Sequence, residues 1–124
     1  MSHEVGDVFL IPNNAIYPPN KKFSICVCAA NNLFFLINSE NREKYDCIAI
    51  TRSDNSFLQH DSFVSCSRVF NYHIFVIKKS KFIGAISNAD LTRIVDKVAS
   101  SEVLSENKIG LITKNLNTRL NRKL

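Results

Sequence analysis

The sequence lacks the segments that would place the chain in a membrane or on the secretory route. No apolar run approaches the ~18 residues that a membrane-spanning helix needs. The first residues, Met1 to Glu4, have neither the basic start nor the apolar stretch of a secretory signal. The 124 residues are 45% hydrophobic and 22% charged, which is typical of a globular chain rather than a disordered one. We therefore expect a soluble, cytoplasmic, single-domain protein with no membrane partner.

Several catalytic and metal-binding motifs are also missing. The chain contains no Walker loop, GxGxxG, HExxH or GxSxG, which argues against NTPases, dinucleotide-dependent enzymes, zinc proteases and α/β-hydrolases. Its four cysteines include one CxC pair, whereas a four-thiolate zinc site usually needs two CxxC-like pairs. Cys26 and Cys28 alternate with apolar residues and would share one face of a strand. We expect no metal, no cofactor, and reduced cysteines that pack as small apolar side chains.

Acidic residues are absent from the last seventeen positions, and this absence locates the net charge. Residues 1–107 hold eleven of the 16 basic and all 11 acidic residues, so the excess of +5 lies in residues 108–124. A basic region can indicate nucleic-acid binding. Apolar residues recur there every four positions, so this basic C-terminal tail is either a short amphipathic helix, packed on the domain or waiting for a partner, or a frayed end: Ile112, Leu116, Leu120 and Leu124.

The chain before residue 80 has the pattern of short β-strands separated by turns. Asn31 and Asn32 predict a tight turn between two of these strands and hence a hairpin. The polar segment 38–46 predicts a loop. The spacing of six or so strands predicts a small barrel or sandwich, with strands in residues 5–11, 23–29, 33–37, 47–51, 63–72 and 74–77.

The hydrophobic period changes after residue 86. Ser87 is a good N-cap, and Asp90 suits the first turn of a helix. The apolar residues that follow form a single stripe at helical spacing, which predicts a helix over residues 88–100 packed on the β-rich part: Leu91, Ile94, Val95 and Val98. The expected fold is mainly β with a C-terminal helix.

Two groups of residues are candidates for chemistry. His60 precedes Asp61 in a loop, and histidine titrates near neutral pH, where it can transfer a proton; the alternative is an ordinary surface loop in which Asp61 supports the turn. Thr51, Arg52 and Ser53 end one predicted strand, and Arg68 lies in a later one. An arginine fork matches a phosphate well. An RNA phosphate could bind between Arg52 and Arg68 if folding brings them together; otherwise both are exposed surface charges.

Four segments, in this order, resemble motifs of the MazF/PemK/Kid family of toxins from bacterial toxin–antitoxin pairs. Gly6 to Phe9 resembles the opening strand of that family, and Cys47 to Ser53 resembles a strand that ends in a Thr-Ser-like turn. Asp61 to Val69 resembles a segment of the form Asp-Ser-hydrophobic-hydrophobic-x-Cys-Asp-Gln-hydrophobic. Residues 83–87, followed by an apolar helical stripe, resemble the closing Ile-Gly turn and helix.

The resemblance implies a small SH3-like β-barrel over residues 1–107, including the helix at 88–100, followed by the basic tail at 108–124. It also implies a homodimer that cleaves single-stranded RNA without a metal, and a cognate antitoxin protein that fills the RNA groove. Such cleavage needs a base for the 2′-hydroxyl, an acid for the leaving oxygen and cations for the phosphate.

The sequence departs from the family pattern at positions that bear on catalysis. Ser67 stands where many active members have an acid, Ser65 where a basic residue is common, and Lys22 where an arginine often begins the second strand. Serine cannot act as a general acid near neutral pH. Arg68, one position further on, would point to the opposite face of a regular strand unless a bulge intervenes.

Two functional hypotheses follow from the resemblance and its departures. The first is an endoribonuclease in which Arg68, His60 and Thr51 are catalytic, while the phosphate-binding set is Lys22, Arg52, Ser53, Ser65 and Ser67. The second is a catalytically inactive module of the same fold that binds a peptide partner or RNA. Both hypotheses need Thr51, Lys22 and Arg68 to surround one shallow hollow.

Overall fold

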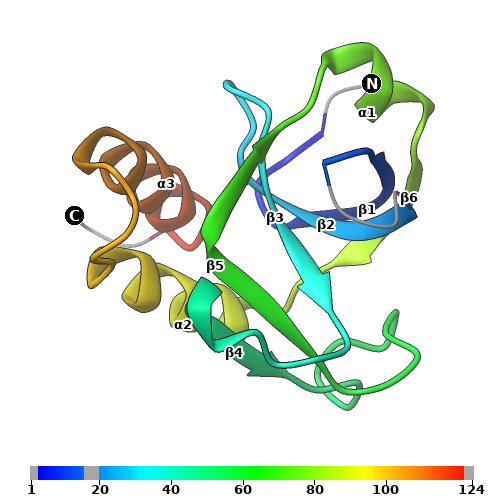
Figure 1. The fold of residues 1–124 in the computed structure, drawn as a ribbon, viewed down its shortest axis with the longest axis horizontal. Coiled ribbons are helices and arrows are strands. Elements are labelled where there is room, and N and C mark those ends of the chain that lie inside the picture. Colours follow the sequence, from blue (N-terminus) through cyan, green and yellow to red (C-terminus); the bar gives the residue numbers. More distant parts are fainter. Residues whose placement is uncertain (1–2, 16–19, 122–124) are drawn as a thin grey trace.

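The computed structural model describes residues 3–15 and 20–121 of the chain. Its central element is one antiparallel six-stranded sheet in the order β4-β5-β3-β2-β1-β6 (Figure 1). The mainly β class is confirmed, and β4 and β6 form the two edges of the sheet. The strands are β1 (Asp7–Asn13), β2 (Asn20–Cys28), β3 (Leu33–Asn38), β4 (Cys47–Ile50), β5 (Ser62–Asn71) and β6 (Lys81–Ala85).

The helical elements are the 3₁₀ helix η1 (Glu43–Tyr45), α1 (Ile74–Lys79), α2 (Asn88–Ala99) and α3 (Glu106–Arg119). Helix α2 confirms the prediction for residues 88–100. Ser87 caps it by accepting a hydrogen bond from the backbone N–H of Asp90, and all four residues of the predicted stripe are buried. Within the described part of the chain, no helix has both the length and the apolar character needed to cross a bilayer.

The predicted strand at residues 74–77 is wrong, because this segment forms α1. His73 starts the helix: its Nδ1 accepts a hydrogen bond from the backbone N–H of Phe75 at 3.2 Å. The sixth strand is instead β6, which pairs with β1 and was not among the predicted strands. Four apolar residues are too few to show whether their hydrophobic period is that of a strand or of a helix. The N-cap that His73 provides favours the helix.

The hairpin of β2 and β3 is confirmed, and its turn contains Asn32 at a φ of +54°. A shift of register between Cys26 and Cys28 turns the end of β2, so that these two side chains enter different apolar clusters. The prediction that they share one face is therefore wrong. Both thiols, and that of Cys66, are free and buried as predicted, while Cys47 is half-buried.

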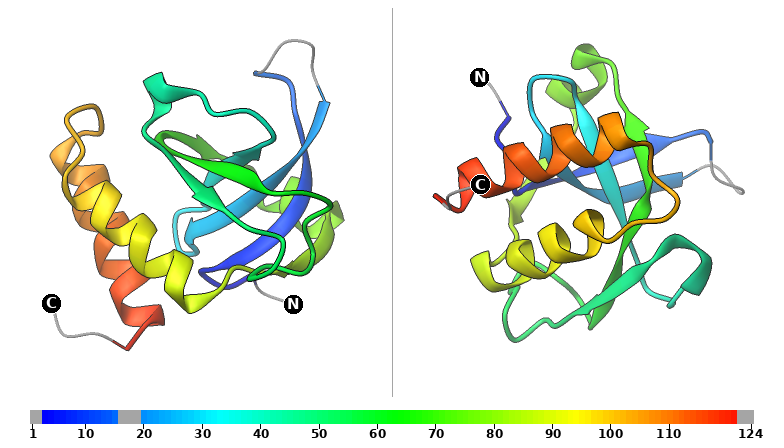
Figure 2. Two further views of the ribbon diagram at one scale, coloured as in Figure 1. Left: turned by 90° about the horizontal axis from the view of Figure 1, so that it is seen from below. Right: turned by 90° about the vertical axis from the view of Figure 1, so that its left-hand side faces the viewer.

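Helices α2 and α3 lie side by side against one face of the sheet, which we call the helix face (Figure 2). The main core lies between them and the sheet, where Ile25, Phe35 and Val64 pack with Leu91 and Ile112. A second, smaller cluster lies on the other face of the sheet, with Ile77 of α1 at its edge. The sheet therefore carries an apolar layer on both faces.

The C-terminal segment belongs to this core. Helix α3 contacts α2 and β2, and Ile112 and Leu116 are fully buried. The helical alternative for the tail is confirmed through residue 119, and the frayed alternative is wrong over that range. The boundary between residues 107 and 108 falls inside α3. Leu124 lies outside the described residues.

Candidate nucleic-acid interface

A set of polar side chains crosses the sheet on the face away from α2 and α3. Phe23 and Ile25 of β2 pack in the main core, so by strand alternation Lys22 and Ser24 point to the opposite face. Further along that face, the amides and hydroxyls bond to one another. We call this set the polar face; Lys22 and Arg68 are half-exposed, and the other six residues are buried: Asn13, Ser24, Asn38, Ser65, Ser67 and Tyr72.

Buried hydrogen bonds fix the middle of the polar face. Asn13 Nδ2 donates to Tyr72 Oη at 2.9 Å, and Ser24 Oγ lies 3.3 Å from the same oxygen. Asn38 Nδ2 donates to Ser65 Oγ at 3.0 Å. Burial raises the pKa of Tyr72, so its hydroxyl stays protonated at neutral pH. Because their partners lie on different strands, these groups hold the face in one shape.

A bulge in β5 brings Arg68 to this face. Ile37 of β3 pairs with Val64 and Phe35 pairs with Val69, so four residues of β5 stand opposite a single residue of β3. Arg68 could share a face with Ser65 and Ser67 only if β5 contained a bulge, and that bulge is present. Ser67, within it, is buried, and its Oγ has no hydrogen-bond partner among the described residues.

Arg68 lies between two aromatic rings. Its Cζ is 5.2 Å from the ring centroid of Tyr45 in η1 and 4.8 Å from that of Phe70, distances at which a guanidinium is attracted to a ring face. Lys44 Nζ lies 5.0 Å from the centroid of the same Tyr45 ring. Arg68 Nη2 makes a long contact of 3.5 Å to the carbonyl of Ala15. Two cations and two half-exposed rings thus gather at one end of the polar face.

The other predicted residues lie in the loops that join β4 to β5. Thr51 Oγ1 accepts a hydrogen bond from the backbone N–H of Asp54 at 3.2 Å, which closes the turn after β4. The backbone N–H of Arg52 donates to Asp61 Oδ1 at 2.9 Å, so this carboxylate supports the turn. The side chains of Arg52 and Ser53 are exposed.

His60 is exposed in the same loop region. Its Nδ1 lies 2.9 Å from the backbone carbonyl of Asp61 and 3.4 Å from Ser62 Oγ. When Nδ1–H donates to that carbonyl, the neutral ring presents Nε2 as its basic nitrogen.

The predicted residues thus fall into two groups. Lys22, Ser65, Ser67 and Arg68 belong to the polar face, where Lys22 and Arg68 sit on strands about 10 Å apart on either side of β3. The loop residues lie beyond Ser62, the partner of Ile50. Thr51 follows Ile50, so it lies beyond the Ser62 end of β5, whereas Arg68 lies at the far end of the bulge. Thr51 and Arg68 also have different neighbours.

Sequence reasoning missed Tyr45, Lys44 and Phe70 as members of the site. Tyr45 lies in the polar segment that was expected to be a loop, and no local signal connects it to Arg68. Their contact depends on the pairing of Cys47, two residues after Tyr45, with Ser65 of β5. This pairing brings η1 alongside the bulge.

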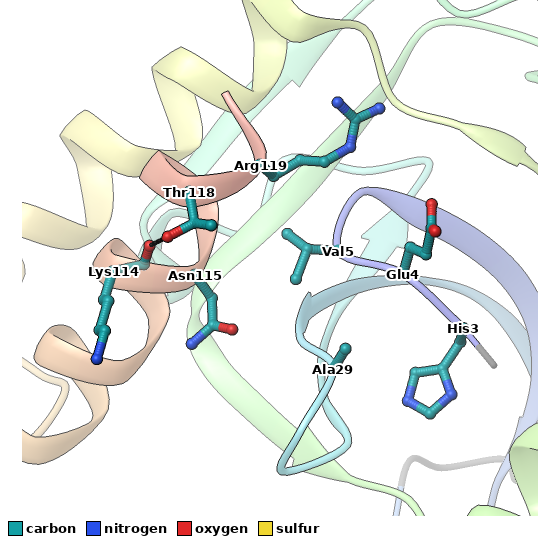
Figure 3. A pocket seen from close by; sticks show the side chains of 8 residues that line it. All are labelled: His3, Glu4, Val5, Ala29, Lys114, Asn115, Thr118 and Arg119. Atoms are coloured by element: carbon teal, nitrogen blue, oxygen red, sulfur yellow. Dashed lines mark hydrogen bonds between the residues drawn. The ribbon is translucent and has the colours of Figure 1, made fainter. Parts of the chain in front are cut away.

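A separate pocket lies between the N-terminal segment and α3 (Figure 3). It has a volume of about 310 Å³, with Val5 and Ala29 on one side and Lys114, Asn115 and Arg119 on the other. None of the residues predicted for RNA binding or catalysis lines it. Lys114, Asn115 and Arg119 of the tail therefore border a pocket that shares no residue with the polar face.

Metal ligands do not cluster in residues 3–15 and 20–121: no three histidine, cysteine, aspartate or glutamate side chains there are arranged to hold an ion. Burial raises the pKa of the Cys26 and Cys66 thiols to about 12, so both are neutral thiols at physiological pH.

Comparison of this chain with protein-family models finds none that matches, and comparison with curated proteins finds no match either. The similarity to the MazF/PemK/Kid toxins therefore rests on the four sequence motifs and their order.

Proposed function

We propose that this chain binds single-stranded RNA on its polar face, in the manner of a MazF/PemK/Kid-like module whose sheet curls as an SH3-like barrel. The observation that supports the proposal best is the position of Arg68 between the rings of Tyr45 and Phe70. Proteins that bind single strands combine cations for the phosphates with aromatic rings on which bases stack. Both kinds of group meet at this point of the surface.

The charges of the polar face suit a phosphate backbone. Lys22 and Arg68 are its ionisable side chains besides the phenol of Tyr72, and Lys44 adds a third positive charge over Tyr45. None of the residues that define the face is a carboxylate. Lys22 and Arg68 are half-exposed and lie on the two strands that flank β3, so each can contact a phosphate of a bound strand.

Binding without cleavage is the better supported of the two hypotheses. The polar face carries no carboxylate or imidazole, and Ser65 is engaged with Asn38. The imidazole of His60 belongs to the loop region beyond Ser62. The residues that define the face therefore include groups that hold a phosphate but no acid–base pair.

Fluorescence anisotropy with labelled oligouridine tests this proposal. Arg68→Ala should weaken binding by about tenfold to a hundredfold, since loss of a hydrogen bond between charged groups costs roughly 1.5–3 kcal/mol. Arg119→Ala, which removes an exposed arginine of α3, is the matched control and should leave the affinity unchanged. Affinity should also fall as salt increases, because phosphate contacts release counterions. Equal affinity for wild type and Arg68→Ala would contradict the proposal.

Endoribonuclease activity is the second candidate, and the exposed, oriented imidazole of His60 favours it. In this version Thr51, Arg52 and Ser53 position a phosphate at the loop, and the homodimer and antitoxin of the family accompany the activity. Purified protein should then cleave an unstructured RNA in the presence of a chelator, and His60→Ala should abolish cleavage while leaving anisotropy binding intact. Intact RNA after prolonged incubation with the wild type would reject cleavage without affecting the binding proposal.

A further inference from the structure

A groove with an apolar floor and a basic rim lies where α1 meets the β1–β6 edge of the sheet. It has a volume of about 330 Å³. We call it the lysine groove: Leu10, Pro12 and Val76 form its floor, and Lys21, Lys79 and Lys81 form its rim. It shares no residue with the polar face.

Large apolar side chains are exposed on α1 and β6, the elements that contribute Val76 and Lys81 to this groove. Phe75 is 63%, Phe82 50% and Val76 36% exposed, and they are three of the four exposed large hydrophobic residues in the described part of the chain. Val76 of α1 lines the groove and Phe75 is its neighbour in that helix, whereas Phe82 of the edge strand β6 packs against Phe9, on the other side of β6 from Lys81. A gathering of exposed apolar groups beside an edge strand marks a surface that another chain covers.

The charge of the groove has a single sign. All three ionisable residues in its lining are lysines, and Lys78 of α1 adds a further exposed cation next to them. The ion pairs found among residues 3–15 and 20–121 join Arg42 to Glu40 and Arg93 to Asp90, so these lysines are not neutralised by a neighbour within that part of the chain. Their complement is a partner with closely spaced negative charges.

The floor of the groove favours a peptide over RNA. It is aliphatic, and the hydroxyl of Ser80 is already engaged, since Ser80 Oγ donates to the carbonyl of Val76 at 2.7 Å. A nucleic-acid base inserted there would leave its polar edge without partners, which is costly on burial. A leucine-sized side chain fits such a floor without that cost.

We propose that the lysine groove binds an extended acidic segment of a partner protein, anchored by one apolar side chain between Leu10, Pro12 and Val76. The carboxylates of the segment pair with Lys21, Lys79 and Lys81. The free edge of β6 can pair with the backbone of such a segment. The groove shares no residue with the polar face, so a result that contradicts one proposal leaves the other unaffected.

The test uses the full chain and a labelled synthetic peptide of alternating glutamate and serine with one central leucine. We expect saturable binding by fluorescence anisotropy. The double charge reversal Lys79→Glu with Lys81→Glu should weaken it by about tenfold or more. The matched control, Lys108→Glu with Lys114→Glu on α3, changes the net charge equally and should leave the affinity close to wild type. Replacing the peptide leucine by serine should also weaken binding.

Three results would overturn the proposal. The first is no saturable binding of the peptide, and the second is an equal loss of affinity in the α3 control, which would indicate non-specific attraction. The third is displacement of the peptide by oligouridine that persists in Arg68→Ala, which would assign the groove to RNA. Circular dichroism of each variant tests whether a loss of affinity comes from unfolding.

Discussion

Asn55 joins the loop after β4 to the start of α2, and its replacement by alanine should destabilise the protein strongly. Its side chain is 2% exposed. Its Nδ2 donates to Asp90 Oδ2 at 2.7 Å and to the carbonyl of Thr51 at 3.1 Å, while its Oδ1 accepts from the backbone N–H of Ser87 at 2.9 Å. One amide therefore connects the turn, the helix cap and a buried carboxylate.

The magnitude follows from what Asn55→Ala leaves behind. The Ser87 N–H loses its partner, and Asp90, only 4% exposed, loses one of three hydrogen-bonding groups while keeping Ser87 Oγ and Arg93. The carbonyl of Thr51 keeps the backbone N–H of residue 55. An unpaired buried donor and a lost bond to a charged group together cost about 3 kcal/mol. For a chain of this size that corresponds to a fall of about 12 °C in Tm.

Thermal and urea unfolding followed by circular dichroism measure this loss, with Asn41→Ala, at an exposed loop position, as the matched control. Asn55→Asp keeps the volume but puts a carboxylate beside Asp90, so it should be destabilising at neutral pH and recover as the pH is lowered and one carboxylate is protonated. A loss below about 0.5 kcal/mol for Asn55→Ala would refute the reasoning, because surface substitutions alone produce changes of that size.

Three further predictions concern the core and its ionisable groups. Leu116→Ala should cost about 3 kcal/mol in urea unfolding, since this side chain is fully buried; an unchanged midpoint would mean that α3 is not part of the core. In the folded protein Ellman's reagent should label Cys47 first, whereas Cys26 and Cys66, with their raised pKa, should react on unfolding. Burial raises the pKa of Asp7 above its ordinary 3.8, so the folded state holds that proton more tightly than the unfolded state, and stability should fall as pH rises through the range just above 3.8. Asp7→Asn should flatten this part of the stability profile relative to wild type, and parallel profiles would contradict it.

Local sequence signals predict an element correctly where its hydrophobic period and its capping residues indicate the same secondary structure. The helix at residues 88–100 was predicted because Ser87, Asp90 and the apolar stripe all indicate the same start and the same face. The run at residues 74–77 has no such agreement: four apolar residues suit a strand as well as a helix, and the capping bond of His73 decides between them. Strand β6 went unrecognised because its apolar run is short and contains Gly84.

The candidate site was harder to predict because long-range pairing assembles it. The bulge in β5 exists because residues 64 and 69 pair with residues only two apart in β3. The sequence indicates that Arg68 can reach this face only if a bulge is present. The residues of β5 do not themselves show that such a bulge forms. The contact of Arg68 with Tyr45 needs both that bulge and the β4–β5 ladder. The predicted residues fall into two groups for the same reason, since Thr51 lies beyond the Ser62 end of β5 and Arg68 lies at the far end of its bulge.

The position of β1 inside the sheet constrains how the protein is made. One edge of β1 pairs with β2, which follows it closely in the chain, but the other pairs with β6, which is synthesised much later. A nascent chain that has formed the β1–β2 hairpin therefore exposes an unsatisfied strand edge until residues 81–85 have emerged. During translation that edge is open to pairing with a neighbouring nascent chain, and expression at lower temperature or with chaperones should raise the yield of folded protein.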